Sequence, residues 1–427
     1  MSRKNKTIFL VMGILLILSV MFTACAPAAA EEAEEPAEAA VAEEVEVEEA
    51  EEAEEAEEAP MEKETVKVAF IAPLTGALSA MGNGGLNSFT VAVNKANEDP
   101  DMKYTFEIVP IDDECKPEVG VQAALKAASD PEIVASVGHY CSMVAISTAD
   151  TFHNNGLANI VWGAVLPDIT YGNDYIEVSR VNGTMHEQND AHAKKMKEDW
   201  GIETVAIIHD TTDYGEGWKE SFSMAAEKYG LEIVSTQGVL IDQTDFNAEL
   251  TTIKALDPDS IYLGVLADLA VPLRNQMIKL GMTDIKYNGT SGSKNDAFIE
   301  GVGAEAAEGC IAWLDGPPVE ALPGGIEFLE AYDAAGFEEP PEAYGPFAYV
   351  AGQVVTHAIN EVGPDRAAVA EYVNTTNMED TIIGPVKFNE YGQNEIPLAS
   401  PYVAQDGVWT YWEDSEYATG VRKLPGD

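Results

Sequence analysis

From residue 66 onward, short apolar runs alternate with longer segments that predict helices. The first run, 66–73 (VKVAFIAP), predicts a strand, and a loop over 74–82 leads to a helix over 87–97. Runs of this kind are typical of strands that are buried on both faces of a sheet. The alternation therefore predicts an α/β fold in which right-handed crossovers connect parallel strands.

The alternation occurs twice, which predicts two lobes. The first half contains predicted strands over 66–73, 104–109, 133–137, 157–162 and 175–181 and predicted helices over 87–97, 117–128 and 143–152. The second half has predicted helices over 186–200, 216–229, 246–256 and 270–280 and predicted strands over 204–209, 231–239, 260–265, 285–288 and 309–314. Helices over 325–335, 344–361 and 366–374 follow, and then β segments near 384–389 and 401–411. We expect the chain to pass between the lobes near Asn182–Gly183, Leu314–Pro318 and Gly384–Val386, where Gly and Pro supply hinge geometry.

The stretch 137–143 (VGHYCSM) is the strongest candidate for a ligand site. It follows the predicted strand 133–137 and precedes the predicted helix 143–152, so Ser142 lies at or next to the helix N-cap. The positive end of a helix favours an anionic or carbonyl group, and ligands of open α/β sheets gather at the carboxyl ends of strands. The alternative is an ordinary strand-to-helix turn that a serine caps.

The N-terminus predicts export. Residues 1–6 (MSRKNK) are basic and residues 7–21 are apolar, which predicts a secretory signal over 1–24 rather than a retained membrane span. The ending Ala24–Cys25 resembles the lipobox of bacterial lipoproteins, and this implies lipidation of Cys25 as the first mature residue. A signal without lipidation is the alternative, because Phe22 stands where leucine is usual.

The next stretch, 25–63, consists almost wholly of Ala, Glu, Val and Pro. Like charges at i,i+4 oppose a helix, and the segment has too little apolar surface to offset the entropy of ordering it. We therefore predict a disordered acidic tether. The formal net charge of the chain is −50, and about −37 of it lies outside the signal and the tether, so nucleic acid is excluded as a partner.

Few residues suggest metal or covalent chemistry. Cys115 and Cys141 are candidates for one disulfide in an exported protein, and Cys310 lies among strand-like apolar residues. The six histidines lack metal-ligand spacing, and neither a nucleophile motif nor a phosphate-binding glycine loop occurs. We expect no cofactor, no metal and no enzymatic activity.

Seven segments resemble, in order, the type I periplasmic binding proteins, and specifically the leucine/isoleucine/valine-binding family of ABC transporters. They are VKVAFIAPLTGALSAMG at 66–82, IDDECKPEVGVQAA at 111–124, VGHYCS at 137–142, VAIIHDTTDYGEGW at 205–218, DSIYLG at 259–264, EAAEGC at 305–310 and IIGPVKFNEYGQ at 382–393. The resemblance implies a two-lobed α/β fold, with a Rossmann-like parallel-sheet sandwich in each lobe, and a three-crossing hinge that closes on a ligand. It also implies that Cys115 pairs with Cys141. We expect one lobe to comprise 64–181 plus 316–384 and the other 182–315 plus 385–427.

Some of the family's binding positions are kept here. Ser142, which follows the second disulfide cysteine, would hold the carboxylate of the ligand. Gly163 would supply a backbone contact, and Tyr214 of the Tyr-Gly-Glu-Gly turn is retained. Tyr140 and Trp162 would add aromatic walls.

Other positions depart from the family. Met81 replaces an aromatic residue, Val165 a threonine and Leu266 a tyrosine. Ser291 falls where the family has the acidic residue that receives the ligand's ammonium group. A buried ammonium without a carboxylate partner costs several kcal/mol, so these changes favour a broad apolar pocket for a carboxylate or amide. The alternatives are that Met81 and Leu266 only pack and Trp162 merely ends a strand, and that Asp268 restores the missing acid.

The resemblance implies a lipid-anchored solute-binding protein that delivers a small ligand to an ABC permease. It would lie outside the cytoplasm, at the outer face of the cytoplasmic membrane or in the periplasm. A branched-chain amino acid is the family's usual ligand, and an apolar carboxylate or amide is the alternative. A sensor that docks on a receptor instead of a permease is a further alternative.

Overall fold

The structure, a computed structural model, describes residues 63–76, 78–395 and 399–427. The predicted signal, the predicted lipidation at Cys25 and the predicted tether, except for Lys63, lie outside the described residues. Within the described ranges, no helix combines the length and the apolar character that a membrane span requires.

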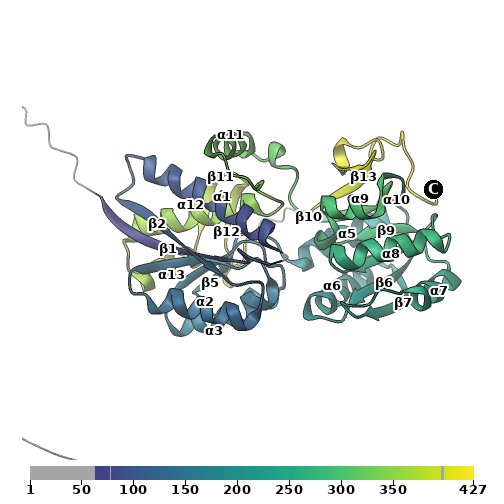
Figure 1. Ribbon diagram of the computed structural model, residues 1–427, viewed down its shortest axis with the longest axis horizontal. Helices are drawn as coiled ribbons and strands as arrows, with labels where there is room; N and C mark the ends of the chain where they lie inside the picture. Colours follow the sequence, from purple (N-terminus) through teal and green to yellow (C-terminus); the bar gives the residue numbers. More distant parts are fainter. Residues whose placement is uncertain (1–62, 77, 396–398) are drawn as a thin grey trace, which may run out of the picture. The chain divides into compact units, whose positions relative to one another are not determined.

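The first lobe is built on a five-stranded parallel sheet in the order β2-β1-β3-β4-β5. Its strands are β1 (Glu64–Ala72), β2 (Tyr104–Asp112), β3 (Ile133–Val137), β4 (Ala158–Val161) and β5 (Val178–Arg180). Its helices are α1 (Ser79–Glu98), α2 (Pro117–Ser129), α3 (Ser142–Asn154), α4 (Asp168–Tyr171), α11 (Gly325–Ala335), α12 (Gly345–Val362) and α13 (Arg366–Asn374). Helices α1 and α12 pack together on one face of the sheet, and α2 and α3 on the other (Figure 1).

The second lobe contains a seven-stranded sheet in the order β14-β13-β10-β9-β8-β6-β7. Its strands are β6 (Thr204–Asp210), β7 (Glu232–Val239), β8 (Ser260–Gly264), β9 (Lys286–Gly289), β10 (Ile311–Asp315), β13 (Ala399–Gln405) and β14 (Val408–Tyr411). Its helices are α5 (Met185–Glu198), α6 (Asp213–Tyr229), α7 (Asn247–Leu256), α8 (Ala267–Lys279), α9 (Asp296–Val302) and α10 (Ala304–Ala307). Within this lobe, strands β6 to β10 are parallel to one another, whereas β13 and β14 are added in the antiparallel direction.

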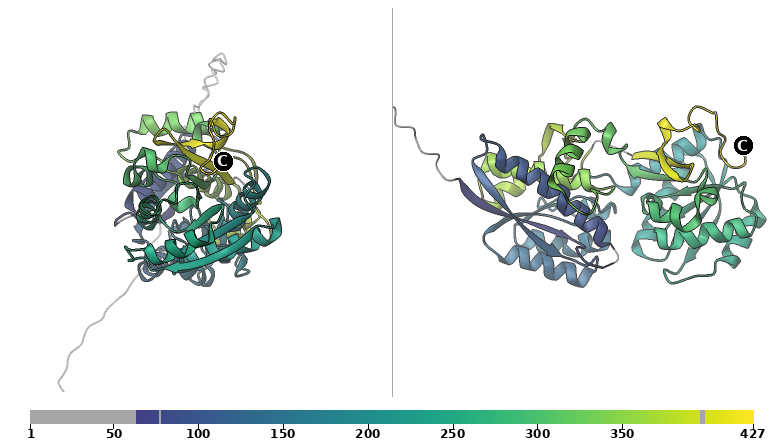
Figure 2. Two further views of the ribbon diagram at one scale, coloured as in Figure 1. Left: turned by 90° about the vertical axis from the view of Figure 1, so that its right-hand side faces the viewer. Right: turned by 45° about the horizontal axis from the view of Figure 1, so that its top comes forward.

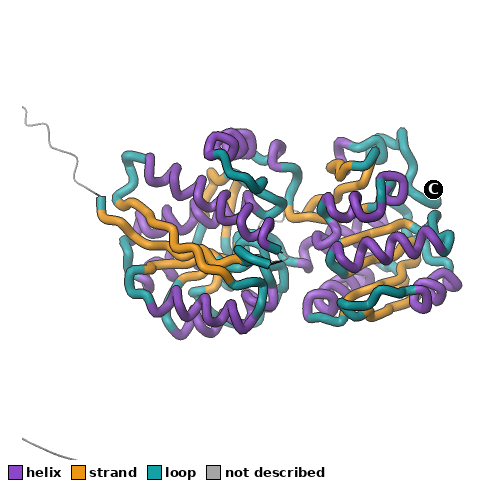
Figure 3. The backbone as a smooth tube through the Cα atoms, in the orientation of Figure 1, coloured by secondary structure: helices purple, strands orange, loops and turns teal. Residues whose placement is uncertain are grey.

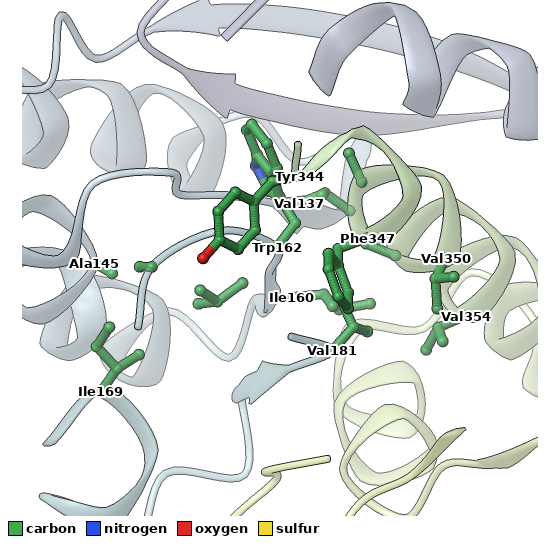
Figure 4. Packing of buried hydrophobic residues seen from close by; sticks show 14 of the residues in the cluster. Val137, Ala145, Ile160, Trp162, Ile169, Val181, Tyr344, Phe347, Val350 and Val354 are labelled. Carbon is green, nitrogen blue, oxygen red and sulfur yellow. The ribbon is translucent and has the colours of Figure 1, made fainter. Parts of the chain in front are cut away.

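In each lobe the strands lie between layers of helix (Figure 3), and two further views show the same arrangement (Figure 2). This layering buries both faces of the strands, as in β3, where all residues are buried. The predicted α/β class with parallel sheets is confirmed. In the first lobe, Trp162 and Phe347 belong to a core that also includes Val137 and Val354 (Figure 4).

The chain passes between the two sheets three times. The first passage follows Arg180 and the second follows Asp315, close to the expected positions. The third comes after Asn394, which is still hydrogen-bonded to the first lobe, and not near Gly384–Val386 as expected. The expected position is instead a hairpin of β11 (Asn377–Thr381) and β12 (Gly384–Lys387), in which Gly384 adopts a φ of 91°.

The chain remains hydrogen-bonded to the first lobe as far as Asn394. The N–H group of Asn394 donates to the carbonyl of Arg180 at 3.0 Å, and the N–H group of Arg180 donates to the carbonyl of Gly392 at 2.8 Å. The buried Gln393 side chain also accepts a hydrogen bond from the Arg180 guanidinium at 2.6 Å. These bonds join the first and third passages to each other.

Helix α1 begins at Ser79, eight residues earlier than its sequence predicts. The early turns contain Gly82, Gly84 and Gly85, which favour a loop in a prediction from sequence. In the structure a Cβ at Gly82 would lie 2.1 Å from the carbonyl oxygen of Pro73, and a Cβ at Gly85 would lie 2.4 Å from the Trp162 ring. The glycines are therefore there because the helix packs closely, and packing outweighs their low helix propensity.

The sequence did not predict several short elements. These are α4, α9, α10, β11 and the 3-10 turns η1 (Ser291–Ser293), η2 (Val319–Ala321) and η3 (Trp412–Asp414). Each spans at most seven residues, too few for a hydrophobic period to be recognised.

Candidate functional site

A cavity of about 110 Å³, partly open to solvent, lies where both lobes contribute side chains. Its lining residues are Leu78, Cys115, Tyr140, Cys141, Ser142, Met143, Gly163, Val165, Leu166, Asp213, Tyr214, Leu266, Ser291, Gly292 and Tyr344. Most of them follow the carboxyl end of a parallel strand, which is the edge at which ligands of α/β sheets bind. Apolar side chains supply most of the exposed lining.

Ser142 lies at one end of this cavity and is buried. It is the first residue of α3, next to the N-cap Cys141, but its side chain does not cap the helix. Its hydroxyl oxygen instead accepts hydrogen bonds from the N–H groups of Val165 and Leu166, at 3.1 and 3.3 Å. The hydroxyl proton is thus available to a ligand oxygen, and the N-terminus of α3 favours negative charge at the same place.

Tyr140 forms an aromatic wall beside Ser142. A Cβ at Gly163 would lie 2.7 Å from a ring carbon of Tyr140, so the glycine lets the ring lie against the backbone. Trp162 is fully buried behind this wall, with its ring centroid 5.6 Å from that of Tyr140 and 5.5 Å from that of Phe70. Burial raises the pKa of Tyr140 well above its ordinary value, so its hydroxyl stays neutral.

The second lobe contributes the opposite wall. Tyr214 lies in the first turn of α6, and Thr212 caps that helix by accepting from the N–H group of Gly215. A Cβ at Gly292 would lie 2.6 Å from the Tyr214 hydroxyl oxygen and 2.9 Å from a methyl carbon of Leu266. Only a glycine therefore allows the tyrosine to reach across this wall.

The structure brings together most of the residues that the sequence predicted for the site. Those that line the cavity are Tyr140, Ser142, Gly163, Val165, Tyr214, Leu266 and Ser291. Met81 lies in the first turns of α1 and is not among the lining residues, and Leu78 lines the cavity from the same segment. Trp162 supports Tyr140 from behind rather than lining the cavity.

Acidic side chains are scarce at the cavity. Among its lining residues the one carboxylate is Asp213, the first residue of α6, whose side chain is exposed. Asp268 is exposed, accepts a hydrogen bond from the N–H group of Leu269 at 3.0 Å, and does not line the cavity. Ser291 does line it, so a hydroxyl occupies the position at which the resemblance implies an acid.

A disulfide joins Cys115 to Cys141, with their Cα atoms 5.6 Å apart. Both cysteines line the cavity, so the bond fixes the loop after β2 to the loop that carries Ser142. Cys310 is a free, buried thiol, and burial raises its pKa to about 11. Within the described residues, no cluster of three or more His, Cys, Asp or Glu side chains could hold a metal ion.

Known proteins share both the sequence pattern and this architecture. A family model described as periplasmic binding protein matches residues 65–405. The chain belongs to the periplasmic binding protein family.

Named relatives cover most of the chain. The Leu/Ile/Val-binding protein homolog 2 of Brucella abortus is 28% identical over 354 residues, which cover 82% of this chain and 92% of that protein. The Leu/Ile/Val-binding protein of Escherichia coli K12 is 26% identical over 330 residues, which cover 77% and 88%. A leucine-binding protein from Thermotoga maritima has a similar structure, with a TM-score of 0.72 at 24% identity and a coverage of 81% and 97%. The predicted family is thereby confirmed.

Besides the two disulfide cysteines, six lining residues of this periplasmic binding protein were not predicted individually as ligand contacts. They are Leu78, Met143, Leu166, Asp213, Gly292 and Tyr344. Four of them adjoin a predicted residue within two positions, so a wider window around each predicted residue would have included them. Leu78 lies in the predicted loop 74–82, whereas Tyr344 lies far along the chain.

Tyr344 precedes α12, and its ring lies edge-on to Tyr140 at a centroid distance of 5.8 Å. The side chain is almost fully buried, and its hydroxyl oxygen has no hydrogen-bond partner within the described residues. Burial raises the pKa of Tyr344 far above its ordinary value. Tyr344 therefore contributes a neutral aromatic side chain to this wall.

Proposed function

We propose that this protein is the solute-binding component of an ABC importer and that it clamps a small apolar carboxylate or amide between its lobes. The supporting observation is the asymmetry of the cavity. One end offers the Ser142 hydroxyl and the N-terminus of α3, whereas Ser291 stands at the position where an ammonium group would need an acid.

The charges that a ligand carries distinguish an apolar carboxylate from a free amino acid. A zwitterion requires a partner for each of its charges, because an unpaired ammonium in a closed cleft costs several kcal/mol. Burying an apolar side chain contributes only about 1.5–3 kcal/mol, which does not offset that cost. An apolar carboxylate needs only the Ser142 end and the apolar walls. Related structures hold such molecules, since solute-binding proteins from R. palustris contain benzoate and 4-hydroxybenzoate.

A branched-chain amino acid is the second candidate, and Asp213 is the observation that favours it. Its carboxylate lies at the cavity and is able to meet an ammonium group when the lobes close. A similar protein from Streptococcus pneumoniae was solved with isoleucine. Because Asp213 is exposed, its ion pair with the ligand would be partly screened by solvent and correspondingly weak.

Delivery to a permease and attachment to the membrane belong to the same proposal. Lipidation of Cys25 would anchor the protein outside the cytoplasm, and the acidic stretch 26–63 would tether the two lobes to that anchor. A sensor that docks on a receptor is the alternative partner class. Permease and ATPase genes beside the gene for this chain would support transport.

Calorimetry with matched ligands tests the proposal. We expect 4-methylpentanoate and 4-methyl-2-oxopentanoate to bind more tightly than leucine, which differs from them in carrying the ammonium group. Asp213→Asn should leave the affinity for these acids within about twofold. Asp268→Asn is the matched control, since Asp268 is an exposed acid on the same lobe that does not line the cavity.

If the ligand is a branched-chain amino acid, the opposite results are expected. If leucine binds at micromolar Kd, loses at least tenfold in Asp213→Asn and is unaffected by Asp268→Asn, Asp213 holds its ammonium group. The apolar acid would then be the wrong ligand class.

A further inference from the structure

Three fully buried polar side chains lie beneath the Ser142 end of the cavity. The Nδ1 atom of His139 is 2.8 Å from a carboxylate oxygen of Asp113, and its Nε2 atom is 3.0 Å from the Thr148 hydroxyl oxygen. The second carboxylate oxygen of Asp113 accepts the N–H group of Cys115 at 2.8 Å. Both ring nitrogens of the histidine are therefore engaged without any contact to solvent.

The three residues come from three different parts of the first lobe. Asp113 follows β2, His139 lies in the loop between β3 and α3, and Thr148 lies in the second turn of α3. Nδ1 faces a carboxylate oxygen of Asp113 and Nε2 faces the Thr148 hydroxyl, which also lies 2.9 Å from the carbonyl oxygen of Val144. The imidazole ring thus has one orientation in which both of its nitrogens are satisfied.

The backbone of His139 is also connected to the segment whose N–H groups donate to the Ser142 hydroxyl. Its carbonyl oxygen accepts the N–H group of Ala164 at 3.3 Å, and the next two residues, Val165 and Leu166, donate their N–H groups to the Ser142 hydroxyl. The Ser142 hydroxyl therefore lies between two segments whose separation is set at His139. A shift of either segment would change the direction in which the hydroxyl proton points.

The disulfide does not make this network redundant. Cys115 and Cys141 each lie two residues after Asp113 and His139, so the disulfide and the Asp113–His139 pair connect the same two loops. The Cys141 carbonyl bonds to the first turn of α3, through the N–H groups of Val144 and Ala145, whereas His139 reaches the second turn through the Thr148 side chain.

We propose that His139, held between Asp113 and Thr148, is a positioning residue that sets the orientation of the Ser142 hydroxyl toward a ligand carboxylate. This inference rests on the proposed function, in which Ser142 contacts that carboxylate. His139 does not itself line the cavity, so it acts through Ser142 and not by contact with the ligand.

Thr148→Val is the sharpest perturbation, because it keeps the shape of the side chain and removes only the hydroxyl. Calorimetry with 4-methylpentanoate should show a five- to tenfold loss of affinity, about the worth of one hydrogen bond. Thr148→Ser, which keeps the hydroxyl, should restore affinity to within about twofold. Thr356→Val is the matched control, since Thr356 is also buried in a helix and donates to a carbonyl four residues earlier, on α12 away from the cavity.

A double-mutant cycle separates positioning from general destabilisation. In the Ser142→Ala background, Thr148→Val should cost less than about twofold, because the hydroxyl that it orients is gone. His139→Asn gives a second cycle, since its amide replaces the donor to Asp113 but does not reach Thr148. Equal losses with and without the Ser142 hydroxyl, in folded variants, would overturn the inference.

Failure of the proposed function has a different signature. If Ser142→Ala binds 4-methylpentanoate as tightly as the parent protein, or if the parent does not bind it, the carboxylate contact is refuted before the cycle is considered. If Thr148→Val does not fold, the His139→Asn cycle decides the inference alone.

Discussion

The buried carboxyl group of Asp315 predicts how the stability of this protein depends on pH. It ends β10 at the second passage between the lobes and is almost completely buried. Burial is the main reason that the pKa of Asp315 rises to about 7, and the nearby Glu187 carboxylate raises it further. The hydrogen bond from Gln188 and the charge of Arg180 oppose this rise without cancelling it.

The hydrogen bonding around Asp315 agrees with a carboxyl group that holds its proton. One oxygen accepts the Gln188 amide N–H at 2.8 Å, whereas the other has no partner within the described residues. The amide oxygens of Gln188 and Asn182 also lack donors there. A proton on the free oxygen of Asp315 would supply a donor in a place where an ionised carboxylate supplies none.

The shift has a defined effect on stability. An unfolded Asp releases its proton near pH 3.9, whereas folded Asp315 keeps it until about pH 7. Between these values the folded chain binds more protons than the unfolded chain, so each pH unit lowers the free energy of unfolding by up to about 1.4 kcal/mol. The favourable contribution is complete below about pH 4 and is lost by about pH 7, a total of at most about 4 kcal/mol.

Asp315→Asn should remove this dependence, since an amide stays neutral and supplies N–H donors. We expect the variant and the parent to have similar melting temperatures at pH 4.5, and the variant to gain several degrees at pH 8. Asp333→Asn, an exposed acid on α11, is the control for a change of net charge. A difference between Asp315→Asn and the parent that stays constant from pH 4.5 to pH 8 would show that Asp315 is charged throughout.

Four further outcomes are expected. Ser142→Ala should weaken 4-methylpentanoate binding by about 1–3 kcal/mol in calorimetry, and an unchanged Kd would remove Ser142 from the site. Gly292→Ala should also weaken binding, because its Cβ would lie 2.6 Å from the Tyr214 hydroxyl oxygen and 2.9 Å from a methyl carbon of Leu266. Adding Tyr214→Phe should restore part of the affinity, because the Leu266 contact remains, and no recovery at all would contradict a clash with the Tyr214 hydroxyl. Thiol labelling of the unfolded, unreduced protein should modify Cys310 alone among the three cysteines of the lobes, and reduction should lower stability by about 2–4 kcal/mol. Mass spectrometry of the exported protein should find a lipid-modified N-terminal Cys25, and an intact leader or an unmodified cysteine would contradict that prediction.

The local pattern was sufficient for the order of the longer strands and helices, but it missed the short elements α4, α9, α10 and β11. An apolar run such as 133–137 is a strand whether or not its neighbours are known, because burial of both faces leaves the same signature in the sequence. The pattern misplaced features whose cause lies elsewhere in the chain. The start of α1 was obscured by glycines that the Trp162 ring and the Pro73 carbonyl require, and Gly384 belongs to a hairpin and not to a hinge.

The residues of the candidate site also fall into those that the sequence predicted and those that only the tertiary structure revealed. The stretch 137–143 identified Ser142 because a strand, a turn and a helix start are local features, and the family resemblance added Tyr214 and Gly163. Three features depended on the tertiary structure: the acceptance by Ser142 of N–H groups from Val165 and Leu166, the contribution of Tyr344, and the burial of Asp315. Each arises where segments distant in sequence meet, and neither periodicity nor propensity encodes such a meeting. The sequence alone thus determined the longer elements and one end of the cavity, whereas packing between distant segments determined the short elements, the walls of the cavity and its charge.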